Sequence, residues 1–265
     1  MHVFIIAVIM GIVEGLTEFL PVSSTGHLII VGHLLGFTGP QASTFEVVIQ
    51  LGAILAVVVM YWPTFLGLIR PQEKRRFSGI YGLWLLFLTS LPASVLGLLT
   101  HSLIKDLLFN PVSVAWALGV GALAILVVER RKTPPKMASL DEIDSKTALY
   151  IGCFQCLALW PGFSRSAATI MGGMILGARR KLSAEYSFIA AVPIMIAASG
   201  FDLSGSWSEM TRTDFVTLVI GFVVSFASAW LAVKGFIALL SAATLRPFAW
   251  YRLALAPFVL LLWPE

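Results

Sequence analysis

The sequence predicts an all-α, polytopic membrane protein, and three observations support that prediction. Of the 265 residues, 58% are hydrophobic and only 12% are charged, whereas a soluble domain is about 25% charged. The apolar residues form long continuous runs, while the strands of a membrane barrel would alternate apolar and polar residues. Several ionisable residues inside these runs, Glu14, Glu18, His27 and Arg165, lie at two breaks that contain proline, Pro21 and Pro161.

The first 36 residues predict two half-length helices rather than one membrane span. Residues 3–20 and 24–36 are both apolar, and Pro21 lies between them. Proline lacks an N–H and clashes with the preceding turn, and the Ser23 that follows is a good N-cap residue. Neither piece is a clean span of about 20 apolar residues. We therefore expect a re-entrant helical hairpin, whose break must be covered by protein or water.

The rest of the chain repeats this order. Clean spans are predicted at 44–62, 80–100 and 112–129, then a charged loop at 130–147, an interrupted region at 148–178, and spans at 184–203, 213–240 and 248–263. Because three spans are an odd number, the second half enters from the opposite side. We expect an inverted-topology repeat with six transmembrane helices and two re-entrant hairpins, whose broken helices form the binding site.

All 265 residues are expected to form a single integral-membrane domain. Repeat one covers about 1–129 and repeat two about 148–265, and the loop 130–147 connects them on the cytoplasmic side. The N-terminal run has no basic region before it and no cleavage site, so we do not expect a removable signal peptide.

The basic residues predict the orientation. Loops on one side carry Arg70, Lys74, Arg75, Arg76, Arg130, Arg131, Lys132, Lys136, Lys146, Arg179, Arg180, Lys181 and Arg246. Loops on the other side carry only Lys105 and Arg212. Because the basic side of a membrane protein is cytoplasmic, both termini and the first hairpin are expected at the outer face, and the second hairpin enters from the cytoplasm.

Two function classes find no support in the composition. The net charge of +4 does not indicate nucleic-acid binding, because the basic residues lie in short loops between apolar runs. Cys153 and Cys156 have a spacing that redox and metal sites use, but no second pair or nearby histidine accompanies them. We expect them to be ordinary packing residues.

The first break concentrates polar groups at membrane depth. Glu14 and Glu18 are four residues apart and share one helix face. His27 ends the motif, and three hydroxyl residues precede it, namely Ser23, Ser24 and Thr25. Because such groups are costly inside a membrane, they mark a functional site by default.

The second break predicts an anion site. Arg165 cannot shed its charge and needs an anionic partner. Three hydroxyl residues accompany it, namely Ser164, Ser166 and Thr169. Arginine and hydroxyls at a helix N-terminus suit a phosphate group. Alternatively, Arg165 pairs with Glu14 or Glu18 and only joins the two halves.

The two breaks resemble the signature motifs of the undecaprenyl-diphosphate phosphatase family, also called the bacitracin-resistance protein family. The motifs are EGLTEFLPVSSTGH at 14–27 and PGFSRS at 161–166, and the resemblance extends to FEVVIQLG at 45–52 and GCFQC at 152–156. One departure is Ala167, where the family usually has glycine.

The resemblance implies an enzyme of the bacterial inner membrane that hydrolyses undecaprenyl diphosphate to undecaprenyl phosphate and inorganic phosphate. This reaction recycles the lipid carrier for peptidoglycan synthesis and protects against bacitracin. The family requires a divalent metal ion, Mg²⁺ or Ca²⁺. The partners implied are the lipid substrate and the bilayer, and the oligomeric state stays open. The active site is expected to open to the periplasmic face, where used carrier is released.

Cleavage of a diphosphate needs a nucleophile, proton transfer and charge neutralisation. Ser24 is the expected nucleophile, or the hydroxyl that positions one. His27 is the expected base, or itself the phosphoryl acceptor, and direct attack by water stays open. Glu14 and Glu18 are expected to hold the metal, because Mg²⁺ and Ca²⁺ prefer oxygen ligands, and Glu18 also counts among the catalytic residues.

The remaining polar residues take supporting roles. Arg165 is expected to grip the phosphates and stabilise the charge that develops on them, and it acts with Ser23, Thr25, Ser164, Ser166 and Thr169. Glu46 and Gln50 are expected to lie just behind the site, and Glu185 near the membrane interface. His33 and His101 are expected to be structural.

Two other functions share part of this pattern. A transporter or flippase of undecaprenyl phosphate would use the same fold and the same phosphate-binding groups, but it needs no nucleophile with a base, such as Ser24 with His27. The lipid phosphatases with a Pro-Ser-Gly-His motif require a histidine after the Ser-Arg pair, and none follows Arg165.

Overall fold

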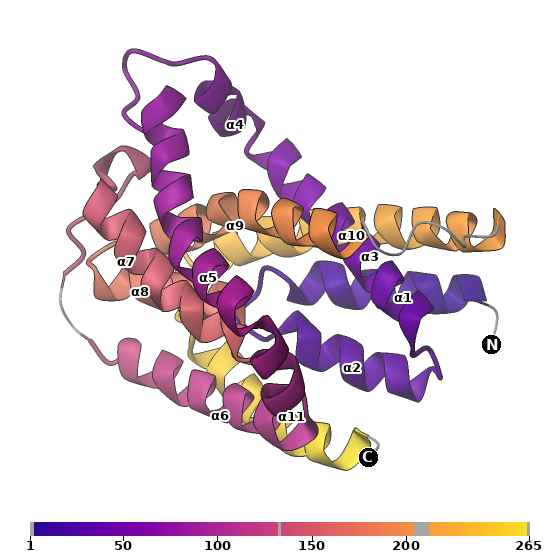
Figure 1. The fold of residues 1–265 in the computed structure, drawn as a ribbon. Coiled ribbons are helices and arrows are strands. Elements are labelled where there is room, and N and C mark those ends of the chain that lie inside the picture. Colours follow the sequence, from indigo (N-terminus) through magenta and orange to yellow (C-terminus); the bar gives the residue numbers. More distant parts are fainter. Residues whose placement is uncertain (1–2, 132–133, 204–211, 264–265) are drawn as a thin grey trace.

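The computed structural model of the protein describes residues 3–131, 134–203 and 212–263 (Figure 1). Within these ranges the regular structure is helical, apart from one isolated bridge between Met137 and Ala178. The α-helices are α1 (Val3–Thr17), α2 (Ser24–Leu34), α3 (Pro40–Met60), α4 (Trp62–Ile69), α5 (Gly79–Leu108), α6 (Pro111–Val128), α7 (Ser145–Gln155), α8 (Arg165–Ile175), α9 (Arg180–Leu203), α10 (Arg212–Leu239) and α11 (Arg246–Leu262). Part of the predicted orientation depends on Lys132 and on the two termini. Lys132, the first two residues and the last two residues lie outside the described residues.

Both predicted breaks are present. α1 stops at Thr17, and α2 starts at Ser24, beyond Pro21. In the second region, α7 runs into a 3₁₀ turn (η2, Cys156–Leu159), and α8 starts at Arg165 beyond Pro161. α1 contacts α2 and α7 contacts α8, so each break joins two neighbouring half-length helices.

Among the described residues, five helices are long and apolar enough to cross a membrane: α3, α5, α6, α9 and α10. The sixth predicted span, 248–263, corresponds to α11, which has 17 residues and includes the fully buried Arg252. It is not among the five. Two boundaries also differ from the prediction. α5 continues to Leu108 because residues 101–108 contain no glycine or proline, and α4 follows α3 with Pro63 in its first turn.

Glycines bring α1 and α3 close to α10. A Cβ atom on Gly15 would lie 2.5 Å from the carbonyl oxygen of Ser225, and one on Gly52 would overlap the carbonyl oxygen of Phe222. Small residues at such contacts let membrane helices approach backbone to backbone, which strengthens van der Waals packing where the hydrophobic effect between helices is absent. This packing fixes the position of α1, which carries Glu14.

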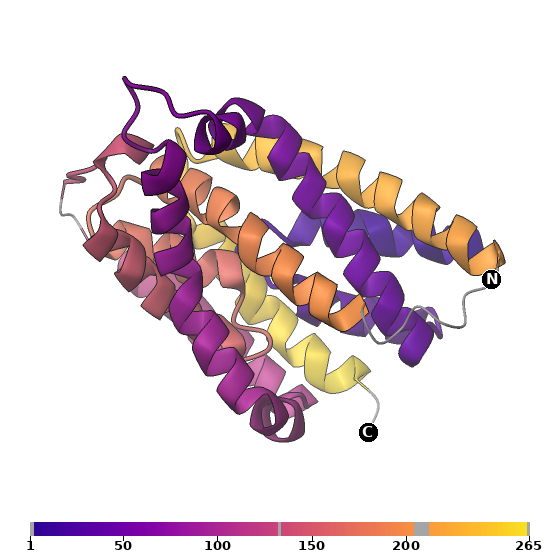
Figure 2. The ribbon, with the colours of Figure 1, turned by 45° about the horizontal axis from the view of Figure 1, so that its top comes forward.

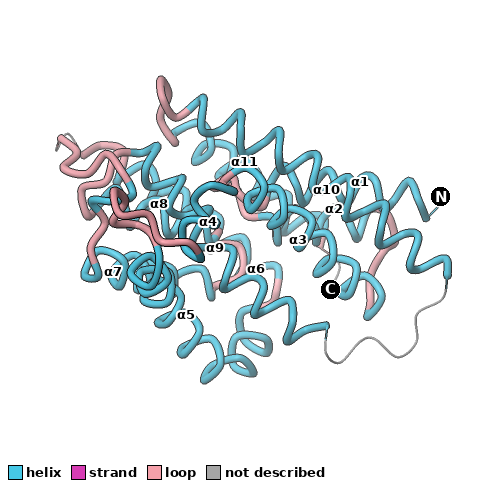
Figure 3. The backbone as a smooth tube through the Cα atoms, turned by 90° about the horizontal axis from the view of Figure 1, so that it is seen from above, coloured by secondary structure: helices cyan, strands magenta, loops and turns pink. Residues whose placement is uncertain are grey.

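The helices form two groups on either side of the breaks. Seen from above, α1, α2, α3 and α10 lie toward one end of the molecule and α5, α7 and α8 toward the other (Figure 3). α11 packs against α6 and also contacts α2 (Figures 1 and 2). The largest buried apolar cluster includes Phe19 and Phe163, one residue from each break, and Phe19 packs edge-on against Phe188 at 5.3 Å. One buried cluster therefore includes residues of both breaks.

Candidate active site

The same unusual backbone conformation begins α2 and α8. Ser23 has φ 72° and Ser164 has φ 75°, and among the described residues no other non-glycine residue has a positive φ. Each is an N-cap, whose hydroxyl accepts a hydrogen bond from the backbone N–H of Gly26 or Ala167. Such a conformation costs about 1–3 kcal/mol and clusters at functional sites. The two helix N-termini, which favour anions, thus begin alike.

A carboxylate lies between the two breaks and connects them. Ser24 Oγ donates a hydrogen bond of 2.6 Å to Glu18 Oε2, and Arg165 Nη2 lies 3.4 Å from Glu18 Oε1. Both charged side chains are largely buried, with 7% of Glu18 and 14% of Arg165 exposed. Glu18 therefore accepts from a hydroxyl of the first break and from the cation of the second. The ion pair between Arg165 and Glu18, which was predicted from the sequence as the alternative to a phosphate site, is therefore present.

Arg165 retains hydrogen-bonding capacity. Its Nη1 donates to the backbone oxygen of Ser187 at 3.2 Å, while its buried Nε has no partner among the described residues. An unpaired N–H on a buried guanidinium costs free energy. An anion that binds beside Arg165 can supply the missing acceptor.

The hydroxyls of the second break divide into two kinds. Ser164 lines the cavity beside Arg165 and its Oγ lies 3.0 Å from Ser166 Oγ. Ser166 and Thr169 are buried, and their hydroxyls bond to Leu20 O at 2.8 Å and Ser187 Oγ at 2.6 Å. They brace the break against neighbouring segments. Ala167 is fully buried inside the first turn of α8.

The hydrogen bonds of His27 go to Ser23 and Tyr251. Its Nδ1 is 2.7 Å from the carbonyl oxygen of Ser23, and its Nε2 is 2.6 Å from the hydroxyl of Tyr251, whose ring stacks on it at 5.6 Å. Since a carbonyl can only accept, Nδ1 carries a proton, and in a neutral ring Nε2 accepts from Tyr251. Both ring nitrogens are therefore engaged away from Ser24.

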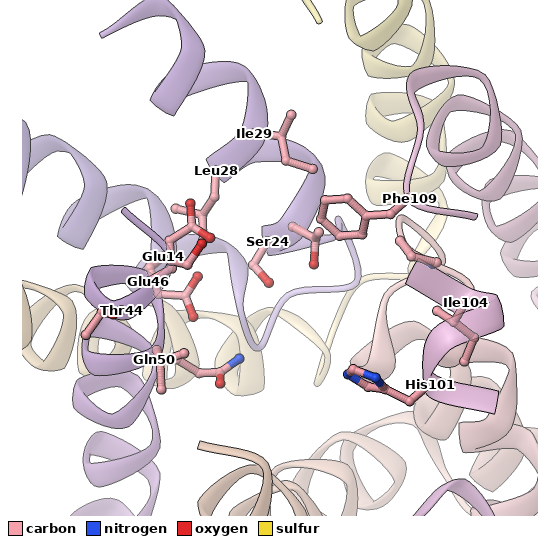
Figure 4. A pocket seen from close by; sticks show the side chains of 14 residues that line it. Glu14, Ser24, Leu28, Ile29, Thr44, Glu46, Gln50, His101, Ile104 and Phe109 are labelled. Carbon is pink, nitrogen blue, oxygen red and sulfur yellow. The ribbon is translucent and has the colours of Figure 1, made fainter. Parts of the chain in front are cut away.

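Two adjoining cavities open beside these residues. One of about 160 Å³ contains Glu18, Ser24, Ser164 and Arg165 in its wall, together with Ser23, Thr25, Gln50, Ala158, Pro161, Gly162 and Met195. The other, of about 630 Å³, shares Ser24, Thr25, Gln50 and Pro161 with it. In Figure 4, Glu14, Glu46 and Gln50 face Ser24 from one side, and His101, Ile104 and Phe109 lie opposite. The small cavity is lined largely by polar residues. The large cavity also has apolar residues in its wall, among them Leu28, Ile29, Ile104 and Phe109.

The donor set fits a divalent cation of the kind that completes its shell with substrate oxygens. Glu14 is 1% exposed, and its Oε2 has no hydrogen-bond partner among the described residues. Glu46 and Gln50 line the same cavity. The described residues contain no cluster of three or more Asp, Glu, His or Cys side chains. Mg²⁺ needs only one or two carboxylates when phosphates and water supply the rest.

The other predicted residues lie as follows. Glu185 is partly buried and lies 3.9 Å from Lys181, one helical turn away. His33 is exposed, while His101 lines the large cavity. Cys153 and Cys156 are both free thiols.

Sequence reasoning missed two residues on α11, Tyr251 and Arg252. Tyr251 contacts His27, and Arg252 is fully buried against both breaks. A signal existed, because an arginine inside the apolar run 248–263 is costly in a membrane and marks a functional position.

Together, these features define a helical membrane protein in which two broken helix pairs bring a hydroxyl, a carboxylate and an arginine together beside a cavity. The chain belongs to the bacitracin resistance protein family BacA, whose sequence pattern matches residues 7–258. It is 70% identical over 257 residues, 97% of each chain, to a protein of Maridesulfovibrio salexigens named undecaprenyl-diphosphatase. Proteins with the same name from Nitratidesulfovibrio vulgaris and Lawsonia intracellularis are 69% and 57% identical over 96% and 97% of each chain.

Proposed function

We propose that the protein is a membrane phosphatase that hydrolyses undecaprenyl diphosphate to undecaprenyl phosphate and inorganic phosphate. The observation that carries this function is the 2.6 Å hydrogen bond from the Ser24 hydroxyl to Glu18 beside Arg165. It pairs a nucleophile with a base at an anion site, and the relatives carry the matching name. The reaction returns the lipid carrier to peptidoglycan synthesis and confers resistance to bacitracin.

Ser24 and Glu18 carry the chemical step. Ser24 Oγ attacks the terminal phosphorus while its proton passes to Glu18 Oε2, which is already 2.6 Å away. The bond from that phosphorus to the bridging oxygen breaks, and undecaprenyl phosphate leaves with the oxygen. The proton on Glu18 passes to the phosphate oxygen that leaves. Water then attacks the phosphorus of the phosphoserine and gives a proton to Glu18, which returns it to Ser24 Oγ as the P–Oγ bond breaks. Inorganic phosphate leaves, and Ser24 and Glu18 regain their starting protonation. Of the nucleophiles that the sequence leaves open, this geometry favours Ser24.

Arg165 and the helix starts neutralise the phosphate. Arg165, whose Nε has no partner among the described residues, and Ser164 both line the small cavity beside Ser24. The N-terminus of α8 adds the positive end of its dipole. Ser23 and Thr25 assist at the start of α2, whereas Ser166 and Thr169 contribute by holding the break. These donors stabilise the charge that develops on the phosphoryl oxygens.

Glu14 is the residue that we expect to hold Mg²⁺ or Ca²⁺, with Glu46 and Gln50 beside it. The orphaned Oε2 of Glu14 supports this assignment. Glu18, the second ligand that the sequence predicts, is already bonded to Ser24 and Arg165, so it is better placed as the base. When bound, the ion neutralises charge on the diphosphate. His27 acts through its contact with the Ser23 carbonyl, which fixes the start of α2.

We further propose the inverted repeat with six spans. Helix contacts support it, because α1 packs on α10 as α7 packs on α5, and α6 contacts α8 as α11 contacts α2. The matching N-caps, Ser23 and Ser164, add to this support. In this arrangement repeat one covers about 1–129, repeat two about 148–265, and the loop 130–147 connects them. α11 is then the sixth span, which has 17 residues and carries the buried Arg252.

The site is proposed to open to the periplasmic face of the inner membrane, with both termini on that side. The basic loops at 70–76 and 130–131 support this orientation. They lie at the left of Figure 1, away from the start of α1 and the end of α11 at the right. The apolar wall of the large cavity suits the first isoprene units of the lipid, while the diphosphate enters the polar end.

Phosphate release from undecaprenyl diphosphate by the purified protein in detergent tests the function. Wild type and Ser241→Ala, a change in an exposed turn, should release phosphate with Mg²⁺ or Ca²⁺ and stop when a chelator is added. Ser24→Ala and Arg165→Ala should lose this activity. A folded wild type that releases nothing, yet binds undecaprenyl phosphate through Arg165, would instead support a transporter or flippase.

A further inference from the structure

Arg252 is a buried cation that the proposed chemistry does not use. Its side chain is fully buried, and the described residues offer it no carboxylate within ion-pair distance. Four backbone carbonyl oxygens accept its hydrogen bonds instead: those of Leu118 at 3.3 Å, Pro21 at 3.4 Å, Ala117 at 3.1 Å and Gly162 at 3.1 Å. Burying a guanidinium this deeply is costly unless its donors are satisfied, so the position calls for an explanation.

Two of these acceptors occupy matching places in the two breaks. Pro21 precedes Ser24 by three positions, and Gly162 precedes Arg165 by three positions. Both carbonyls lie ahead of a helix start, where no intrahelical partner is available to them, and a buried carbonyl needs a donor. A single guanidinium thus bonds to the segment that carries the nucleophile and to the segment that carries the phosphate-binding arginine.

The neighbouring helix leaves space for this side chain. Arg252 also bonds to α6 through Ala117 and Leu118. A Cβ atom on Gly121 would overlap Nη2 of Arg252 and lie 2.8 Å from its Cζ. Any larger residue at position 121 would push the guanidinium away from the breaks, whereas a Cβ on Gly119 in the same helix meets nothing within 4 Å.

We propose that Arg252 is a positioning residue that holds the two breaks in register, so that Ser24 and Arg165 meet at Glu18. This inference rests on the proposed function for its activity readout. The arrangement requires the forked geometry of arginine, because a lysine ammonium donates from one point and cannot span carbonyls on three segments. Positive charge at this place is not sufficient.

The test compares Arg252→Met, Arg252→Lys and Gly121→Ala with wild type and the matched control Gly119→Ala. We expect kcat to fall about 100-fold in Arg252→Met, because a shift of about 1 Å in a reacting group costs that much. Arg252→Lys and Gly121→Ala should each lose about tenfold or more by the same argument. KM of Gly121→Ala should stay close to that of wild type. Its unfolding temperature should fall, because the displaced guanidinium loses buried acceptors, and Gly119→Ala should match wild type throughout.

Hydrogen exchange at the two breaks supplies a readout that does not depend on activity. Amides in residues 18–28 and 160–170 should exchange faster in Gly121→Ala and Arg252→Met than in Gly119→Ala. Full kcat in Arg252→Lys would show that charge alone suffices and would overturn the proposal, as would unchanged exchange and kcat in Gly121→Ala. An inactive wild type whose breaks still loosen in the variants would refute the phosphatase but retain the positioning role. Should Arg252→Met not fold, Gly121→Ala decides the question, because it keeps the arginine.

Discussion

Glu18→Gln isolates the base from the geometry of the site. Glutamine has nearly the same shape, so the side chain can still contact Ser24 and Arg165, but it cannot take a proton at neutral pH. The bond that changes is the 2.6 Å contact from Ser24 Oγ to Glu18 Oε2, a charge-assisted hydrogen bond of the short, strong kind. The substitution therefore tests whether Glu18 accepts the proton of the nucleophile.

The magnitude follows from the role. General base catalysis contributes about 10²- to 10⁴-fold, which is about 3–5 kcal/mol at 1.36 kcal/mol for each tenfold change. The contact between Arg165 and Glu18 is long, at 3.4 Å, so the change from a carboxylate to an amide there should alter phosphate binding little. We therefore expect kcat to fall by that factor while KM changes little, the pattern of an interaction made in the transition state.

The assay is phosphate release in detergent over a range of substrate concentrations. Glu185→Gln is the matched control, because Glu185 pairs with Lys181 away from the cavities and its substitution should leave kcat unchanged. Acid quenching with labelled substrate should trap a phosphoenzyme in wild type and none in Ser24→Ala. Turnover by Glu18→Gln at the wild-type rate would refute the assignment of Glu18 as base.

Three further predictions concern packing, metal binding and pH. Gly52→Ala forces a methyl group onto the carbonyl oxygen of Phe222 and should lower stability by about 1–3 kcal/mol, measured by thermal unfolding in detergent. Glu14→Gln should raise the Mg²⁺ concentration for half-maximal activity by about tenfold or more, measured by metal titration of phosphate release. Asp144 caps α7, and its hydrogen bonds from Thr147 lower its pKa. The stabilisation by the Asp144 carboxylate is therefore complete above the unfolded pKa of about 3.9 and is lost as pH falls through the lower folded pKa. The unfolding temperature of wild type should fall over this pH range. Asp144→Asn keeps a good cap but has no carboxylate to titrate, so its unfolding temperature should fall less.

Each of these predictions has a control. A Cβ on Gly235 meets nothing within 4 Å, so Gly235→Ala should unfold like wild type, and equal destabilisation of both variants would contradict the packing argument. Glu185→Gln should titrate with Mg²⁺ as wild type does. A wild type and an Asp144→Asn variant with parallel pH profiles would show that the cap is not the source of the acid sensitivity.

The broken hairpins were predictable because a proline and capping hydroxyls occur together at each break. Pro21 and Pro161 lie between helices, and the hydroxyls that follow cap the next ones. Proline alone was not enough, since Pro92, Pro193 and Pro257 lie inside α5, α9 and α11. The apolar runs likewise gave the long helices α3, α5, α6, α9 and α10 within a few residues. Helix ends were less predictable where no breaking residue stands, and α5 passes its predicted end at residue 100 for that reason.

The partners of the site residues depend on contacts between distant segments. The sequence predicted that His27 acts on Ser24, because the two residues are one helical turn apart. In the structure, His27 contacts Tyr251, and Glu18 accepts the hydrogen bond from Ser24. The role of Arg252 was not predicted because its acceptors are backbone carbonyls. Every residue has a backbone carbonyl, so the sequence does not indicate which carbonyls lack a partner. Spacing gives which side chains share a face, but not which of them bond.

The two serines with positive φ, Ser23 and Ser164, are followed by different side chains in the two halves. After Ser23 the chain places a hydroxyl, Ser24, and after Ser164 it places a guanidinium, Arg165. The same backbone conformation thus presents a hydroxyl in one half and a cation in the other. Two identical halves would present two hydroxyls or two cations, whereas the proposed reaction needs one of each. A single chain that contains both halves meets this need, because each half can change without the other.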